Sequence, residues 1–186
     1  MSLLPALASF QQSLVYNLVM KKQSAGLLVY RLKNGQPQVL IVHIGGPWMA
    51  NKDKGAWTIP KGEYEASEDP LKVAYNEFAE ELSKKPPASE PLPLGTIEQK
   101  NNKTVIAWAI EGDLDLIGAK SNTVKIEWPP KSGKIQEFPE VDKPGWYSLE
   151  AAAQKLLSAQ VPLLQRLAEH LNIDFDPAKG EQPSLF

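Results

Sequence analysis

The sequence predicts a mixed α and β domain from three observations. Its 186 residues are a usual length for one domain, and 42% hydrophobic with 23% charged residues is close to the average of globular proteins. Short runs rich in leucine and β-branched residues are separated by turn residues, as in hairpins. Between these runs the hydrophobic period changes from two residues to about 3.6, which indicates a helix.

Two hairpins are predicted from these runs. Residues 24–32 and 38–44 are joined by Lys-Asn-Gly-Gln-Pro, and residues 95–99 and 103–111 are joined by Lys-Asn-Asn. Glycine, asparagine and proline supply the backbone angles of tight turns. A short apolar run, Ala-Trp-Thr-Ile-Pro, follows the first hairpin at 56–60.

A helix is predicted to begin at Pro70 and to end before Pro86. Asp69 is a good N-cap, and proline suits the first helical position. The apolar residues of one face are Leu71, Ala74, Tyr75, Phe78 and Leu82. This face is expected to pack on the core.

The second half of the chain is predicted to hold fewer elements. Residues 112–144 are expected to form a long loop with one strand at 123–128. A short strand at 145–148 and helices at 149–158 and 161–171 follow.

The predicted domain covers residues 20–175. Residues 1–19 are expected to be an N-terminal extension or leader, and residues 176–186 a C-terminal tail. The first 19 residues lack the basic start of a signal peptide and are too short in their apolar run to span a bilayer. A cytoplasmic protein without membrane contact is therefore expected.

Composition limits the chemistry. Twenty Lys and Arg against 22 Asp and Glu leave a formal charge of −2, so no polymeric nucleic acid is expected as a partner. With no cysteine and two histidines, any metal must be held mainly by oxygen. Hard cations such as Mg²⁺, Mn²⁺ and Ca²⁺ prefer such ligands.

Acidic residues gather on the predicted helix. Glu77, Glu80 and Glu81 share one strip of its surface, where like charges one turn apart repel by a few tenths of a kcal/mol per pair. A divalent cation would remove this repulsion. A solvated acidic face is the alternative interpretation of three glutamates taken alone.

The residues around this strip resemble the Nudix box. The segment GEYEASEDPLKVAYNEFAEELS, from Gly62, carries the box residues at the required spacing: Gly62, Glu68, Glu77, Phe78, Glu80 and Glu81. The preceding Trp-Thr-Ile-Pro-Lys resembles the approach to the box in Nudix enzymes that cleave diadenosine polyphosphates. The likeness covers about residues 24–171 and departs from the pattern at Asn76, where the box has arginine, and at Ser83, where it has glycine.

The resemblance implies a Nudix fold, an α/β/α sandwich of the α+β type with a mixed sheet between helices. It implies Mg²⁺- or Mn²⁺-dependent hydrolysis of a pyrophosphate linkage in a nucleoside diphosphate joined to another group. Dinucleoside polyphosphates rank first as substrates, then nucleoside triphosphates, then ADP-ribose or nucleotide sugars. The alternative is a catalytically weak nucleotide-binding or regulatory module, because Asn76 cannot form the charged pair of the box arginine. The oligomeric state is left open.

The resemblance also implies roles for individual residues. Glu77, Glu80 and Glu81 would hold the metal together with the backbone carbonyl of Lys61. Glu80 is the first choice to orient or deprotonate the attacking water, with Glu77 as a second catalytic acid. Gly62, Glu68 and Asn76 would be structural, with Glu68 bracing the loop.

A further acid outside the box is expected to complete the site, and Glu137 and Glu140 are both candidates. Their alternative is two exposed loop acids.

Four residues are candidate substrate contacts besides Glu140. The Lys61 ammonium could bind a phosphate, and Trp48 and Tyr64 could stack on a base. His43 ends a strand before Gly45-Gly46-Pro47 and could contact phosphate or ribose. The alternatives are a solvated lysine, aromatic loop anchors and an ordinary strand-end histidine.

Overall fold

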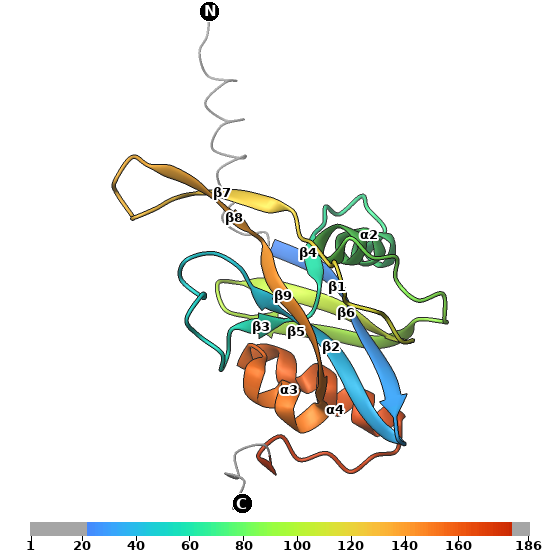
Figure 1. Cartoon of the computed structure of the whole chain (residues 1–186). Coiled ribbons are helices and arrows are strands. Elements are labelled where there is room, and N and C mark those ends of the chain that lie inside the picture. Colours follow the sequence, from blue (N-terminus) through green and yellow to red (C-terminus); the bar gives the residue numbers. More distant parts are fainter. Residues whose placement is uncertain (1–21, 180–186) are drawn as a thin grey trace, which may run out of the picture.

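A mixed β-sheet forms the centre of the computed structural model, which describes residues 22–179 (Figure 1). The seven-stranded sheet has the order β3-β2-β1-β6-β5, with β4 paired to β1 and β9 paired to β2. Its strands are β1 (Lys22–Lys33), β2 (Gln36–Ile44), β3 (Trp57–Thr58), β4 (Lys61–Glu63), β5 (Leu92–Gln99), β6 (Lys103–Glu111) and β9 (Val141–Ser148).

The two predicted hairpins are confirmed. β1 pairs with β2 in antiparallel orientation through a turn at Asn34 and Gly35, both of which have positive φ. A two-residue turn of this kind matches the twist of the strands that it joins. β5 pairs with β6 in the same way, whereas β1 and β6 run parallel in the middle of the sheet.

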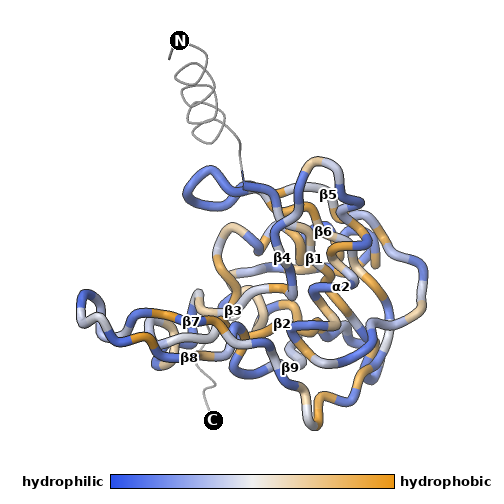
Figure 2. The backbone as a smooth tube through the Cα atoms, turned by 90° about the horizontal axis from the view of Figure 1, so that it is seen from above, coloured by the Kyte–Doolittle hydropathy of each residue, from blue (hydrophilic) through white to orange (hydrophobic). Residues whose placement is uncertain are grey.

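Helices cover both faces of the sheet, so the predicted sandwich is confirmed (Figure 1). α2 (Pro70–Leu82) packs on one face through Ala74, Phe78 and Leu82. α3 (Leu149–Lys155) and α4 (Val161–His170) pack on the other face. Apolar segments are concentrated in the strands between these layers (Figure 2).

α2 has the predicted bounds and caps. The Asp69 carboxylate accepts a hydrogen bond from the Leu71 N–H, and Pro70 begins the helix. The helix ends at Ser83, which takes the left-handed conformation (φ 50°) that the box usually gives to glycine. Its hydroxyl donates a hydrogen bond to the Lys120 carbonyl, so a side-chain contact supports the strained cap.

The strand predicted over 123–128 is confirmed, but the rest of 112–144 is not one loop as predicted. β7 (Thr123–Glu127) and β8 (Ile135–Pro139) form a separate antiparallel hairpin, which we call the arm. Figures 1 and 2 both show it projecting from the sheet. The proline-rich turn between the two strands gives no hairpin signal in the sequence, so their pairing was not predicted. The strand predicted over 145–148 also begins earlier, because β9 starts at Val141.

The helix predicted over 149–158 is shorter than expected. Leu156 leaves the helical conformation, and the Leu157 N–H donates to the Trp57 carbonyl at 2.8 Å. A 3₁₀ turn, η1 (Ser158–Gln160), then leads into α4. Contact with the β3 strand therefore overrides the helical pattern.

The last described residues lie against α3. The predicted leader at 1–19 lies outside the described residues. Residues 176–179 form a turn, and the Gln154 amide donates to the Pro177 carbonyl. Within residues 22–179 the structure contains no helix of the length and apolarity that crossing a membrane requires.

The side chain of Gln160, in η1 before α4, links this helical layer to the strand residues just before the box. Gln160 is fully buried; its Oε1 accepts from the Ile59 N–H at 2.9 Å and its Nε2 donates to the Thr58 hydroxyl at 2.8 Å. The strand leading to Lys61 is thus held from the α4 side of the sheet.

We predict that Gln160→Leu lowers the free energy of unfolding by about 2–4 kcal/mol, because it leaves buried polar groups without partners. Urea denaturation measures this loss. Gln165→Leu, at an exposed position of α4, is the matched control and should change stability by less than about 0.5 kcal/mol. Equal effects of both substitutions would contradict the role given to Gln160.

Candidate active site

Gly62 in β4 lies directly beneath the carboxylate of Glu77 on α2. A Cβ atom at this position would collide with Cδ and both carboxylate oxygens of Glu77. Glycine at this position therefore leaves room for the Glu77 carboxylate to lie over β4. The glycine of the box and its first helical glutamate form one packed unit.

The backbone of Lys61 faces away from β1. The Leu27 N–H donates to the Pro60 carbonyl and the Tyr64 N–H donates to the Gln23 carbonyl, so alternate residues of the β4 segment bond to β1. Lys61 lies between two such positions, opposite Gly26. In an antiparallel pair its N–H and C=O then point away from the partner strand. The carbonyl predicted as a metal ligand is thus not used by β1.

Glu81 is buried without full compensation. The residue is 8% exposed, and its Oε2 has no hydrogen-bond partner among the described residues. Burial raises the pKa of Glu81 to about 7, although the charge and backbone of Lys61 act in the opposite direction. A buried carboxylate oxygen without a partner costs free energy that a cation would recover.

Glu77 and Glu80 lie beside this group. Burial, followed by the charges of Glu80 and Glu140, raises the pKa of Glu77 above its ordinary value. Glu80 is exposed, and its carboxylate accepts a weak hydrogen bond of 3.4 Å from the Asn122 amide. The charge of Glu80 thus acts on Glu77 and that of Glu77 acts on Glu81, and the predicted role of the three glutamates as metal ligands stays a prediction.

These residues fit a hard divalent cation by their chemistry. Within residues 22–179, no three histidine, aspartate or glutamate side chains are already arranged as a cage. Carboxylates that repel one another are expected to lie apart until a cation draws them in. The donors are all oxygens, and one of them, Glu81 Oε2, is buried with no hydrogen-bond partner from residues 22–179.

The structure distinguishes the two candidate acids outside the box. Glu140 acts on the pKa of both Glu77 and Glu81, so its carboxylate lies near them. Glu137 lies in β8 on the arm, where its carboxylate accepts a hydrogen bond from the Thr123 hydroxyl. Glu140, and not Glu137, is among the largest causes of the pKa shifts of those two glutamates.

The other box positions are structural in their contacts. The Glu68 carboxylate accepts from the Glu65 N–H at 2.8 Å and closes the turn before α2. Asn76 is exposed on α2.

Asn122 is a further residue of the site that the sequence does not predict. Its amide contacts Glu80, while its carbonyl accepts from the Glu140 N–H at 2.9 Å. No motif marks Asn122, because its role depends on how the arm returns to the sheet.

The structure argues against the predicted substrate contact of His43. The ring is fully buried, with Nε2 2.7 Å from the Lys52 carbonyl and Nδ1 2.8 Å from the Asp142 carboxylate. An edge-to-face contact with Trp57 covers it further. His43 thus packs between β9 and the loop after β2.

The remaining candidate contacts are placed differently. Trp48 is 51% exposed in the loop after β2. Tyr64 is partly buried against the α2 side of the core. Lys61 is partly buried, and burial lowers its pKa while the charge of Glu81 opposes that shift.

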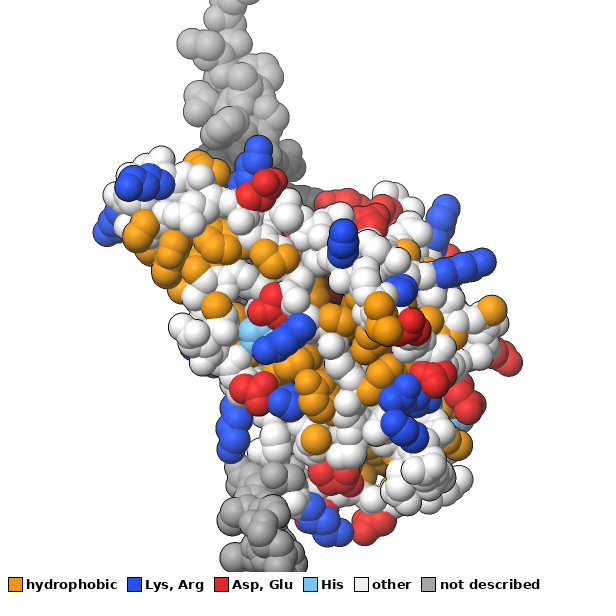
Figure 3. Space-filling view, viewed as in Figure 1, with side chains coloured by type: hydrophobic (Ala, Val, Ile, Leu, Met, Phe, Trp, Pro, Cys, Tyr) orange, Lys and Arg blue, Asp and Glu red, His pale blue; other side chains and the backbone are white. Residues whose placement is uncertain are grey.

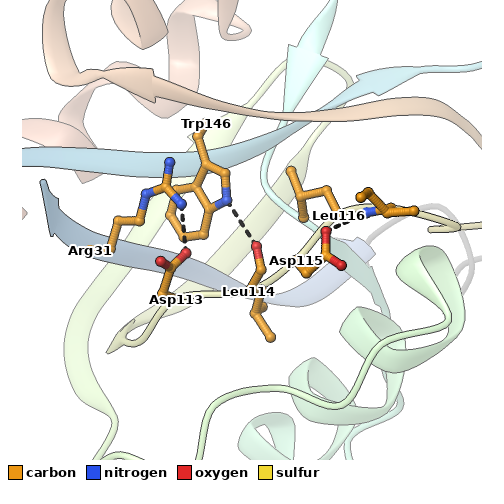
Figure 4. A pocket seen from close by; sticks show the side chains of 7 residues that line it. Arg31, Asp113, Leu114, Asp115, Leu116 and Trp146 are labelled. Carbon is orange, nitrogen blue, oxygen red and sulfur yellow. Dashed lines mark hydrogen bonds and ion pairs between the residues drawn. The ribbon is translucent and has the colours of Figure 1, made fainter.

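Two cavities flank the α2 face of the sheet. One of about 280 Å³ is lined by Glu81, by residues 119–121, which we call the Lys120 loop, and by residues of β9. A larger one of about 680 Å³ lies between the loop after β6 and Trp146 (Figure 4). There Arg31 stacks on Trp146 and pairs with Asp113 at 2.6 Å, and the Trp146 indole donates to the Leu114 carbonyl. Its main polar groups are already paired, so we assign the chemistry to the smaller cavity.

A family model matches most of the chain. The model of the NUDIX domain matches residues 20–167. The chain belongs to the Nudix family. The resemblance predicted from the box is thereby confirmed, and so is the assignment as a Nudix pyrophosphohydrolase at the level of the family.

Solved structures agree with the Nudix fold. An Ap4A hydrolase binary complex from C. elegans matches with a TM-score of 0.56 and 21% identity over 80% of this chain and 98% of that one. The NUDIX domain of Shewanella oneidensis NrtR, complexed with ADP ribose, matches with a TM-score of 0.59 and 14% identity over 92% and 99%. Comparison with curated protein sequences gives no match.

Glu81 makes the stability of the metal-free protein depend on pH. Because its folded pKa, about 7, exceeds the ordinary value of 4.5, stability is fully present below about pH 4.5 and is lost as pH rises through 7. The loss is roughly 3 kcal/mol at most.

We therefore predict that Glu81→Gln, measured by thermal unfolding in EDTA, is more stable than the wild type at pH 8 and loses this advantage at pH 5. Glu65→Gln, in the exposed turn before α2, is the control and should follow the wild type at both values. A wild type whose stability relative to Glu81→Gln does not change with pH would contradict the burial of an ionisable Glu81.

Proposed function

We propose that this Nudix protein is a hydrolase that depends on a divalent cation, Mg²⁺ or Mn²⁺, and cleaves a pyrophosphate linkage in a nucleoside diphosphate joined to another group. The observation that carries the proposal is the carboxylate of Glu81, which is buried beside Glu77 and whose Oε2 has no hydrogen-bond partner in the described part of the chain. The Lys61 charge acts on this carboxylate, yet burial still raises the pKa of Glu81 to about 7. Three repelling carboxylates around a packed glycine suit a cation and an anionic substrate.

Each residue of the site has a role in metal binding or in the attack of water. Glu77, Glu80 and Glu81, with the Lys61 carbonyl, would hold the cation, which when bound neutralises phosphate charge and acidifies water. Glu80, positioned by Asn122, orients the attacking water and accepts its proton. The water oxygen bonds to phosphorus, the bridging P–O bond breaks, and the second phosphate leaves as an anion. Glu140 adds negative charge that acts on Glu77 and Glu81, and we propose it in preference to Glu137 as the acid outside the box.

Dinucleoside polyphosphates rank first among the substrates. The support is the Trp-Thr-Ile-Pro-Lys-Gly approach to the box and the fold shared with a C. elegans Ap4A hydrolase. Nucleoside triphosphates and ADP-ribose or nucleotide sugars follow. The predicted cytoplasmic location stays a prediction.

A nucleotide-binding module with weak catalysis is the second candidate, and Asn76 is the observation that favours it. An exposed asparagine on α2 cannot hold a box glutamate by a charged pair.

Hydrolysis of a substrate panel separates the two candidates. We expect the wild type with Mg²⁺ to release phosphate-containing products from diadenosine tetraphosphate faster than from ATP or ADP-ribose. Glu80→Gln should lower kcat by about 10²–10⁴-fold, because it removes the proton acceptor, whereas Glu65→Gln should keep the wild-type rate. A folded wild type that turns over none of these substrates would favour the binding module.

Restoring the box arginine tests the effect of Asn76. We expect Asn76→Arg to raise kcat, because an arginine can pair with a box glutamate by a charged hydrogen bond. Asn76→Gln, which lengthens the side chain without charge, is the control. A rate that stays unchanged or falls in Asn76→Arg would show that the site works without this pair.

A further inference from the structure

We propose that the arm and the loop after β2 form a subsite for the second nucleobase of a dinucleoside polyphosphate, the base on the far side of the phosphate chain. The subsite, called the aromatic shelf, consists of Trp48, Ile126 and Trp128. This inference rests on the proposed function, and it assigns a role to the arm that the metal site does not explain.

The shelf is an exposed aromatic surface. Trp48 and Trp128 meet edge to face, with ring centroids 5.2 Å apart and planes at 80°. Trp48 nevertheless keeps 51% of its surface exposed. Figure 3 shows an apolar patch beneath the arm, on the side of the loop after β2. A large exposed tryptophan beside further apolar groups marks a binding surface more often than a free one.

The register of the arm explains why these side chains share one face. Val124 pairs with Phe138 and Ile126 pairs with Gln136, and alternate residues of a strand point the same way. Val124, Ile126 and Trp128 are therefore on one face. Ile126 approaches Gly46 closely, since a Cβ atom there would lie 3.5 Å from its Cδ1. The loop after β2 thus packs against this face and presents Trp48 beside it.

The shelf is joined to the acidic site at its base. The Gly45 N–H donates to the Glu140 carbonyl at 2.8 Å, and a Cβ at Gly45 would collide with the Pro139 carbonyl. Asn122, just before the arm, contacts both Glu80 and the Glu140 backbone. The start and the end of the arm are therefore fixed at the glutamates, and the shelf begins where the site ends.

The charge of the arm and the aromatic rings of the shelf favour a nucleotide over a protein partner. The arm carries Lys125, Lys131 and Lys134 against Glu127 and Glu137, a net charge of +1 that favours an anionic ligand. An aromatic pair offers a stacking face for one base, and every base has a π-face that can stack. A phosphate chain held at the glutamates would carry its second base toward the arm.

Equilibrium binding tests the shelf. Calorimetry with Mg²⁺ compares two non-hydrolysable ligands, diadenosine tetraphosphate and ATP with methylene groups in place of the bridging oxygens. We expect the wild type to prefer the dinucleotide, and Trp48→Ala to reduce this preference about tenfold, the equivalent of about 1.4 kcal/mol. Trp48→Phe keeps a stacking ring and should restore most of the preference. Leu32→Ala, which truncates an exposed apolar side chain at the far end of β1, is the matched control.

Three results would overturn the shelf while leaving the proposed function in place. The first is a preference unaffected by Trp48→Ala, and the second is an equal loss for both ligands, which would place Trp48 at the reacting nucleotide. The third is a wild-type dimer that Trp48→Ala turns into a monomer in sedimentation, which would make the shelf a contact with a second copy. A wild type that binds neither ligand and hydrolyses no substrate would instead overturn the proposed function.

Discussion

The burial of Glu81 against its like-charged neighbours is the constraint on which the site depends. Folding places a carboxylate where water cannot solvate it, one turn from Glu77 and beside the backbone of Lys61. Such a group is tolerated if it is protonated or if it faces a positive charge. The protein contains no cysteine and has its nearer histidine packed elsewhere, so a hard cation is the natural partner for these oxygens.

The rest of the fold holds this unfavourable cluster in place. Gly62 lets β4 pass beneath Glu77, and Gln160 fixes the residues before it from the opposite layer. Ser83 and the Lys120 loop hold the C-terminal end of α2. Asn122 ties the arm to Glu80 and Glu140. The carboxylates are therefore positioned by neutral hydrogen bonds and packing, which takes over part of the role that the absent arginine would have as a charged partner.

Much of this site could be predicted from the sequence because the box is local. Helix α2, its Asp69 cap, its buried face and the strip of three glutamates all follow from spacing within about two dozen residues. The arm could not be predicted as a hairpin, because a proline-rich turn separates its two strands. Its contact with the loop after β2 joins residues far apart in the sequence, which appears only in the folded chain. For the same reason the sequence did not separate Glu140 from Glu137, did not identify Asn122, and left His43 open as a substrate contact although it is fully buried. The elements of the box, which are close in the sequence, were predicted correctly. The contacts of Asn122 and His43 with Glu140 and Asp142 join distant parts of the chain and could not be predicted.

Titration with Mn²⁺, followed by the electron paramagnetic resonance signal of the free ion, measures whether the buried carboxylate of Glu81 binds a cation. We predict that the wild type binds Mn²⁺, that Glu81→Gln weakens this binding by at least tenfold, and that Glu65→Gln leaves it unchanged. Equal Mn²⁺ affinity in the wild type and in a folded Glu81→Gln variant would contradict the claim that the buried carboxylate is directed at a cation.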